Sequence, residues 1–413
     1  QSTALGTGVT ANEIKLGISL TDFECIKGAI DFIRVNQEQN YQAYIDDING
    51  RGGINGRKIV PVFHRFCPIP DAARLVSICT KFTDDDKVFA VMGNLFDPSG
   101  NAQTCVAKKH KTVLFAYMLT KEIIDKSPPG LIIYPGDVPE RTTQILTGLL
   151  KSAGTLSGKK VAILGETTSS KTVTSSVEPA LKALGVQTGS TAILQIAGLD
   201  TTSAQSQLDS FIERWKTEGV NALFVSGTQV ASSQFIDKVR REIPEVLLVT
   251  DVGEVLDFAK DETKAGKKPN PYEGILAATG PTESEYDRSE NWKYCADIYK
   301  AKTGKDAPKS TTVLPEIDGK RDDLYNAIND ACQMLATFEQ IASKVGPYLN
   351  NENWQSTVDS FGPIINRGGG QYASLSKGKY DFNDTFRLSA FDSSIAPTGN
   401  WKSLTDLQNI PGS

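Results

Sequence analysis

The chain has 413 residues, of which 39% are hydrophobic and 23% charged, and its formal net charge is −5. This length exceeds what one ordinary hydrophobic core organises, so we expect two domains. The acidic balance argues against nucleic acid as a partner, because that partner favours a basic stripe. No apolar run approaches the roughly 20 residues that a membrane-spanning helix needs. The composition therefore indicates a globular protein with more than one domain.

The first part of the chain alternates predicted strands and helices. In order, we expect a strand at 13–20, a helix at 28–49, a strand at 58–63 and a helix at 71–82. The glycine-rich run 49–56 lies between the first helix and the second strand. It lacks the Gly-Lys-Ser/Thr ending of a phosphate loop and follows a helix instead of preceding one. It therefore predicts a turn.

The stretch 88–118 determines the fold prediction. Two short apolar runs, 88–92 and 112–116, are too brief for helices, and their Val, Phe and Leu content favours buried parallel strands. The residues between them have helical spacing. Ligands of open parallel sheets lie beyond the carboxyl ends of the strands. The loops 93–97 and 117–120 are therefore the first candidates for a binding site.

The rest of the chain repeats this alternation and ends in a glycine-rich and polar part. Expected strands lie at 131–134, 159–164, 191–196, 222–225, 246–250, 274–279 and 386–391. Expected helices lie at 140–151, 172–184, 204–216, 232–241, 285–302 and 322–344. The charged segment 254–271 predicts a surface excursion, and 303–321 predicts a long polar loop. The alternation indicates a second parallel sheet.

The six cysteines favour disulfides over a metal site. No CxxC occurs, and with only His64 and His110 as further ligands we expect no structural zinc. Helix faces and strand ends suggest three pairs in an exported protein. The predicted pairs are Cys25–Cys67, Cys79–Cys105 and Cys295–Cys332. Six reduced core cysteines are the alternative, and other pairings stay open.

Catalytic patterns are missing from the sequence. We find no nucleophile–base set, and no Gly-x-Gly-x-x-Gly follows the first strand, which argues against a dinucleotide cofactor. We therefore expect no enzyme activity, no catalytic residue, no metal and no cofactor. A hydrolase or dehydrogenase built on two α/β lobes is the rival interpretation.

Six stretches carry a family resemblance over nearly the whole chain. They are IKLGISLTDF, YIDDINGRGGINGRKIVPVF, CPIPDAARLVSICTKFTDDDKVFAVMGN, KKVAIL, VNALFVSGT and RLSAFDSS. In this order they resemble the type I periplasmic binding proteins of the leucine/isoleucine/valine-binding family, which are solute-binding subunits of ABC importers. The cysteine placements resemble those of actinobacterial members. That likeness implies an extracytoplasmic lipoprotein, and the start at Gln1 instead of Met suggests a mature form.

The resemblance implies an α/β fold of two doubly wound parallel-sheet lobes. Three hinge crossings would join the lobes, which would close around a ligand in a cleft between them. The expected lobes are 9–137 with 281–378 and 138–280 with 379–400, followed by a peripheral tail at 401–413. The implied partners are a small-molecule ligand and an ABC permease in the membrane, with the receptor acting as a monomer.

The residues that match the family's ligand site depart from those of its amino-acid binders. The expected small hydroxylated residues and tyrosines are missing, and Asp251 stands where a Glu is expected. We therefore predict a larger, partly apolar ligand, such as an aromatic or alicyclic carboxylate. A branched-chain or other amino acid, or a sensing role without transport, is the alternative. The predicted ligand-binding residues are Phe23, Asn94, Leu95, Phe96, Tyr117, Met118, Ser169, Ser170, Thr228, Gln229 and Asp251.

Several of the polar candidates also have a structural interpretation. Arg65 and Arg141 could clamp a ligand carboxylate or could be surface charges. Asp251 could cap the helix that follows it. Ser169 and Ser170 precede a helix, where capping and anion contact are compatible.

Overall fold

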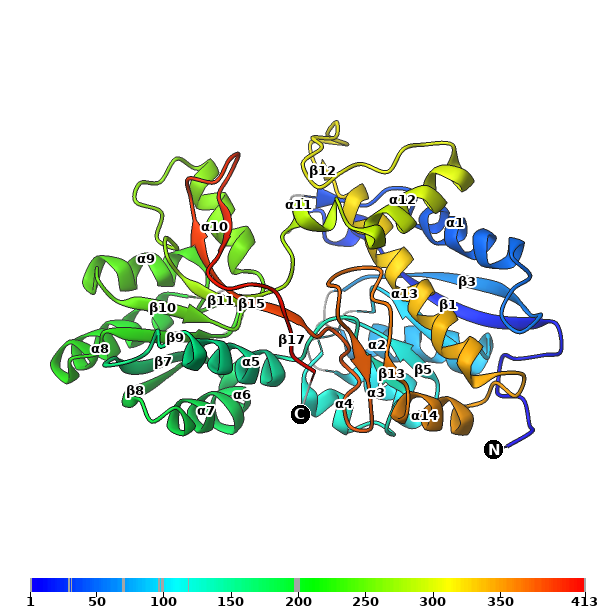
Figure 1. Cartoon of the computed structure of the whole chain (residues 1–413), viewed down its shortest axis with the longest axis horizontal. Helices are drawn as coiled ribbons and strands as arrows, with labels where there is room; N and C mark the ends of the chain where they lie inside the picture. Colours follow the sequence, from blue (N-terminus) through cyan, green and yellow to red (C-terminus); the bar gives the residue numbers. More distant parts are fainter. Residues whose placement is uncertain are drawn as a thin grey trace. The chain divides into compact units, whose positions relative to one another are not determined.

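The computed structural model describes residues 2–28, 30, 32–68, 71–95, 97, 100–117, 119–196 and 201–411. Contacts divide the chain into two units, which are described separately (Figure 1). Unit 1 comprises Gln1–Val138, Glu283–Thr385 and Pro411–Ser413, and unit 2 comprises Pro139–Thr282 and Phe386–Ile410. The chain thus passes between the units at 138/139, 282/283 and 385/386, and again at 410/411.

Unit 1 is built on a parallel sheet with the strand order β3-β1-β4-β5-β6. The strands are β1 (Glu13–Thr21), β3 (Lys58–Phe66), β4 (Ala90–Gly93), β5 (Val113–Phe115) and β6 (Ile132–Ile133). Leu16 of β1 lies opposite Pro61 of β3 and Ala90 of β4. The apolar runs bury because helices cover both faces of such a sheet.

The helices of unit 1 form two packed groups. In one, α1 (Gln37–Gly50) lies against α12 (Glu290–Thr303) and α13 (Leu324–Val345). In the other, α2 (Ala72–Thr80) and its π-helical extension η2 (Lys81–Asp85) lie against α3 (Asn101–Thr104) and η3 (Cys105–Lys109). The remaining elements are η1 (Phe23–Cys25), α4 (Lys121–Asp125), α11 (Glu283–Tyr286), α14 (Asn351–Asp359), the pair β2 (Phe32–Ile33) and β12 (Arg321–Asp322), and the pair β13 (Gly362–Pro363) and β14 (Ser374–Leu375).

Two helices expected in unit 1 differ from those observed. The helix expected at 28–49 begins at Gln37, because Phe32–Ile33 pairs with β12 as an extended strand and Asn36 adopts φ 55°. The helix expected at 285–302 is two helices, α11 and α12. Ser289 starts the second, since its hydroxyl accepts the Trp292 N–H at 3.1 Å as an N-cap.

Unit 2 is built on a mixed sheet with the order β16-β15-β11-β10-β9-β7-β8, and β17 also pairs with β15. β11, β10, β9, β7 and β8 run parallel, whereas β15 is antiparallel to β11 and to β16. The strands are β7 (Lys160–Glu166), β8 (Gln187–Leu194), β9 (Ala222–Ser226), β10 (Leu247–Thr250), β11 (Leu276–Thr279), β15 (Thr385–Asp392), β16 (Asn400–Ser403) and β17 (Gln408–Asn409).

The helices of unit 2 cover both faces of this sheet, in green in Figure 1. They are α5 (Pro139–Ser152), η4 (Thr167–Ser169), α6 (Ser170–Thr172), η5 (Val173–Val177), α7 (Glu178–Ala183), α8 (Thr202–Glu218), α9 (Ser233–Glu242) and α10 (Val255–Lys264). Val161 and Ile163 of β7 belong to a core with residues of α5 and α7. Ala162 and Leu164, which alternate with them, belong to a second core with residues of α8 and α9. Two-sided burial of one strand confirms the doubly wound α/β fold.

Two segments of unit 2 are more regular than the sequence suggested. Residues 254–271, expected as a surface excursion, contain α10, whose Val255 and Ala259 are buried. Residues 401–410, expected as a peripheral tail, pack with unit 2, because β16 and β17 add to the edge formed by β15. Residues 379–385, expected in the second lobe, pack with unit 1 instead.

The three predicted disulfides are confirmed. Cys25–Cys67 joins the loops that follow β1 and β3, Cys79–Cys105 joins α2 to η3, and Cys295–Cys332 joins α12 to α13. Within the described part of the chain, no helix combines the length and the apolar character that crossing a membrane requires.

Candidate functional site

In unit 1, predicted ligand residues follow the carboxyl ends of β4 and β5. β4 ends at Gly93, which has φ 104° and where a Cβ would overlap the carbonyl oxygen of Ser19. Only glycine fits this turn. Asn94 comes next, half-buried, with its N–H donating to Ser19 O at 2.9 Å. Leu95 is 1% exposed and belongs to the hydrophobic core of unit 1, so its side chain is covered.

Phe23 lies at the end of β1, in η1. Its ring packs edge-to-face on Phe32 with centroids 5.8 Å apart, and the Arg321 guanidinium lies 5.4 Å from the Phe32 centroid. The Cys25–Cys67 disulfide fixes this loop to the end of β3. Phe23 thus belongs to an aromatic cluster at the carboxyl edge of the sheet.

Tyr117 follows β5 and is the predicted residue with the most extensive polar contacts. Its hydroxyl lies 3.1 Å from Asp330 Oδ1 and 3.1 Å from Gln333 Oε1. A phenol has one hydrogen, so it donates to one of these acceptors at a time, and the charged carboxylate is the stronger. Burial, together with the negative charge of Asp330, raises the pKa of Tyr117 well above its usual value. Tyr117 therefore stays protonated and acts as a donor.

Arg34 is a buried cation of this edge that the sequence did not single out. Its Nε donates to Asp323 at 2.8 Å and its Nη1 to Asp330 at 2.7 Å, with only 14% of its side chain exposed. Burial disfavours its charge, but the Asp330 and Asp323 carboxylates outweigh this effect and raise the pKa of Arg34. Asp330 thus connects Arg34 to Tyr117.

In unit 2, side chains link the loops that follow β7 and β9. Glu166 is 6% exposed, and its carboxylate accepts from Val230 N–H at 3.0 Å and from Thr168 Oγ1 at 2.7 Å. Ser169 accepts from Glu166 N–H at 3.0 Å and donates to Ser226 O at 2.7 Å. These bonds order the carboxyl edge of the second sheet.

Asp251 follows β10 at the same edge and is held by two hydroxyl groups. Thr143 Oγ1 lies 2.8 Å and Ser226 Oγ 3.0 Å from Asp251 Oδ2. Burial raises the pKa of Asp251 to about 7, although both hydroxyl groups lower it and Glu140 adds a smaller increase. Near neutral pH this carboxyl can therefore accept a hydrogen bond as an anion or donate one as an acid.

The structure brings only some of the predicted residues into these networks. Asn94 and Tyr117 lie at the edge of unit 1, and Ser169 and Asp251 are linked through Ser226 in unit 2. Thr228 and Gln229 are exposed after β9, and Ser170 starts α6. Phe96 and Met118 lie outside the described residues.

The alternative interpretations of the polar candidates now have structural answers. Asp251 does not cap α10, whose N-cap position is Glu254. Arg65 lies on the surface, 3.4 Å from Glu38 with 54% of its side chain exposed. Arg141 is buried, and its Nη2 donates to Ile410 O at 2.9 Å.

Arg34, Asp330 and Ser226 were missed by the sequence interpretation. Arg34 was assigned to the interior of a helix, and Asp330 lies 213 positions from its partner Tyr117. Ser226 is the last residue of β9, and the strand-end rule that selected 93–97 would have found it.

Solved structures resemble this chain over nearly its whole length. A fatty acid ABC transporter substrate-binding protein from Thermomonospora curvata is 17% identical, with a TM-score of 0.62 over 98% of this chain and 95% of that chain. An ABC transporter solute-binding protein from R. palustris in complex with 4-hydroxybenzoate is 15% identical, with a TM-score of 0.65 over 97% and 98%. A substrate-binding protein from Desulfitobacterium hafniense in complex with Leu is 14% identical, with a TM-score of 0.62 over 95% and 100%. At these identities, the likeness establishes the fold.

Comparison with curated protein sequences gives no significant match. The profile of the family described as "Periplasmic binding protein" matches residues 14–314. This match spans more than half of the chain and includes the ends of β1, β4, β5, β7, β9 and β10. The chain therefore belongs to the periplasmic binding protein family.

Proposed function

We propose that the protein is the solute-binding receptor of an ABC importer and that its ligand is a small, partly apolar carboxylate of the aromatic or alicyclic type. The environment of Asp251 is the observation that carries the ligand class. A partly buried carboxyl with a pKa of about 7 can donate a hydrogen bond to a ligand oxygen in its protonated form. An α-ammonium group requires the ionised form instead, which burial makes less favourable.

The residues of unit 1 support the same ligand class. Tyr117 is a protonated phenol whose hydrogen is taken by Asp330 or Gln333, and its ring lies at the same sheet edge as the largely buried ring of Phe23. Flat apolar groups pack favourably on such rings. The relatives with known ligands include binders of 4-hydroxybenzoate and of Leu. The alternative of an amino-acid ligand is therefore an outcome of the test below.

A thermal-shift screen tests the ligand class. The probes are benzoate, 4-hydroxybenzoate, cyclohexanecarboxylate, octanoate and leucine. A ligand at a hundredfold excess over its Kd stabilises the folded state by about 2.7 kcal/mol, which raises Tm by several degrees. We expect a rise with the aromatic or alicyclic acids that is larger than the rise with leucine. A rise with leucine alone would contradict the proposed ligand class.

Transport requires a membrane partner, and the proposal includes an ABC permease that receives the ligand. It also includes a monomeric receptor, without catalytic activity, whose full-length form is lipid-anchored on the outer side of the membrane. The permease and the extracytoplasmic location rest on the family to which the chain belongs. The lipid anchor rests on the likeness of the cysteine placements to those of actinobacterial members.

A further inference from the structure

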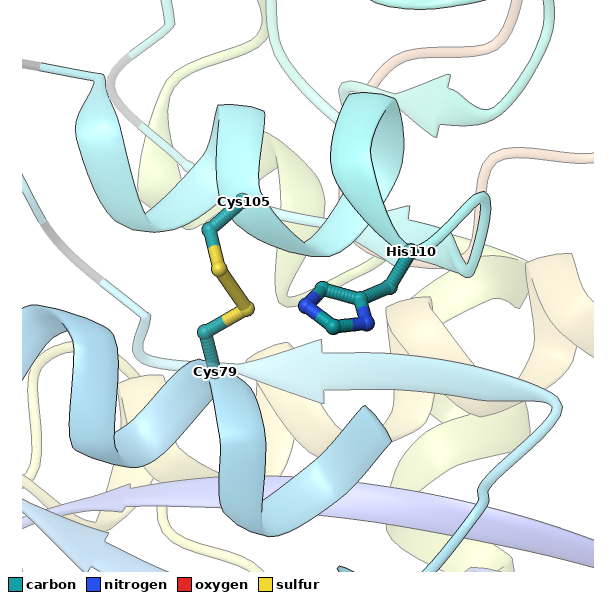
Figure 2. A group of neighbouring side chains, drawn as sticks. All are labelled: Cys79, Cys105 and His110. Carbon is teal, nitrogen blue, oxygen red and sulfur yellow. A yellow bond between two sulfur atoms is a disulfide. The ribbon is translucent and has the colours of Figure 1, made fainter. Parts of the chain in front are cut away.

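A disulfide and a histidine lie together in unit 1, and none of the three residues is a predicted ligand residue. Cys79 comes from α2, Cys105 starts η3, and His110 directly follows η3 (Figure 2). One ligand atom from each of the three residues lies within 4.8 Å of the others. Among the described residues, no other group of three or more His, Cys, Asp or Glu side chains gathers in this way.

The orientation of the imidazole is fixed by Asp84. His110 Nδ1 lies 3.1 Å from Asp84 Oδ1, so in the neutral ring Nδ1 carries the hydrogen and donates it to the carboxylate. Nε2 then carries the lone pair. This atom is buried, has no hydrogen-bond partner among the described residues, and points toward the disulfide in Figure 2. A histidine oriented by a carboxylate through its other nitrogen is the usual arrangement of a metal ligand.

We propose that the reduced form of this cluster is a zinc site in which Cys79 Sγ, Cys105 Sγ and His110 Nε2 are the protein ligands and water is the fourth. Zinc prefers two thiolates and an imidazole at about 2.3 and 2.0–2.1 Å, in a tetrahedron that separates ligand atoms by roughly 3.4–3.8 Å. The disulfide holds the two sulfurs closer together than this, so reduction has to let them separate, whereas a nitrogen of the imidazole already lies within 4.8 Å of both. Shifts of side chains on two packed helices complete the geometry.

The site exists in two exclusive states. A thiol reductant supplies two electrons and two protons, which convert the disulfide into two thiols, and zinc then displaces these two protons as it binds the thiolates. Zinc binds only the reduced state. At a thousandfold excess over its Kd, zinc therefore shifts the thiol-to-disulfide ratio of this pair about 1000-fold toward the thiols.

Cobalt binding under anaerobic conditions tests the site in the 413-residue chain. After reduction with a phosphine, we expect one Co²⁺ per chain, with thiolate charge-transfer absorption that an equimolar amount of Zn²⁺ abolishes. Cys79→Ser with Cys105→Ser removes this binding, whereas the matched pair Cys25→Ser with Cys67→Ser retains it. Asp84→Asn weakens it roughly 10–100-fold, because the histidine loses its orienting carboxylate. Folding is followed by circular dichroism.

Two results would overturn the proposal. One is a reduced, folded protein that binds no cobalt, and the other is binding that survives replacement of Cys79 and Cys105. If reduction unfolds the chain, the unsubstituted protein in a glutathione buffer gives the decision, with each disulfide quantified by mass spectrometry. Zinc should shift the Cys79–Cys105 pair alone, and an equal effect on all three disulfides, or none, rejects the site.

Discussion

Asp251 makes the stability of unit 2 depend on pH. Its pKa is about 7 in the folded chain and about 3.9 in an unfolded one, so the folded state binds the extra proton between these values. Its contribution to stability is complete below pH 4, declines as the pH rises and is lost above pH 7. Three pKa units correspond to about 4 kcal/mol, which the partial exposure of the carboxyl reduces to about 2 kcal/mol.

Asp251→Asn keeps a hydrogen-bond donor but removes the charge that burial disfavours. Relative to the unsubstituted protein, its free energy of unfolding should therefore be about 2 kcal/mol higher at pH 8 than at pH 4.5. Urea unfolding at the two pH values measures this difference. Asp406→Asn, which replaces an exposed carboxylate, is the control. Equal stabilities of Asp251→Asn and the unsubstituted protein at both pH values would contradict the assigned cause.

Arg34 is a second residue whose replacement has a calculable cost. Arg34→Met removes the cation of Asp330 and one of the two cations of Asp323, which keeps Arg321 at 3.1 Å. We therefore expect a loss of about 3 kcal/mol, the lower end of the range for a broken buried pair. Arg65→Met is the matched control, since an exposed pair contributes about 0–1 kcal/mol. Denaturant unfolding compares the two variants. Adding Asp330→Asn to Arg34→Met should recover part of the loss. Similar losses of stability in Arg34→Met and Arg65→Met would reject the buried network.

At the scale of elements, the turn after β4 positions the first predicted binding loop. Gly93→Ala places a Cβ against the backbone of β1 at a positive φ, and we expect a loss of about 2–4 kcal/mol. Gly148→Ala is the matched control, because this exposed glycine lies inside α5 with open space around it. It should gain up to about 1 kcal/mol from helix propensity. Thermal unfolding of both variants tests the pair, and a neutral Gly93→Ala contradicts the predicted strain.

Local patterns were enough to predict most elements. The apolar runs of β1, β4, β5, β7 and β9 fit buried parallel strands, and the cysteine pairs followed from helix faces and strand ends. The start of α1 could not be predicted in this way. Phe32–Ile33 is extended because it pairs with β12, almost 290 positions later, and no local signal reports such a partner.

The same limit applies to the candidate site. Tyr117 was predicted because it follows a strand, where the strand-end rule applies, and Asp251 because the family resemblance places it where a Glu is expected. Arg34 and Asp330 were not found, because their importance arises from contacts between segments distant in sequence. Burial of Leu95 also depends on the packed core. Sequence patterns locate the sheet edge, and tertiary contacts decide which side chains on it are free to bind.

At the scale of the whole molecule, predicted ligand residues occur in both units, and each unit is tested separately for its part in binding. With an acid identified in the thermal-shift screen, Asn94→Ala in unit 1 and Asp251→Ala in unit 2 should each weaken binding at least tenfold, about 1.4 kcal/mol. Asp406→Asn should leave it unchanged. Calorimetric titration gives the Kd values, and an unchanged Kd in either variant removes that residue from the predicted ligand site.

The pH dependence of the same titration distinguishes the two ligand classes. For a carboxylate ligand that accepts a hydrogen bond from protonated Asp251, affinity should fall as the pH rises through about 7, and Asp251→Asn should keep binding and lose this dependence. An amino acid held through its ammonium group requires the ionised form, so its affinity should rise over the same interval and collapse in Asp251→Asn. The direction of the change around pH 7 thus decides whether Asp251 meets the ligand as an acid or as an anion.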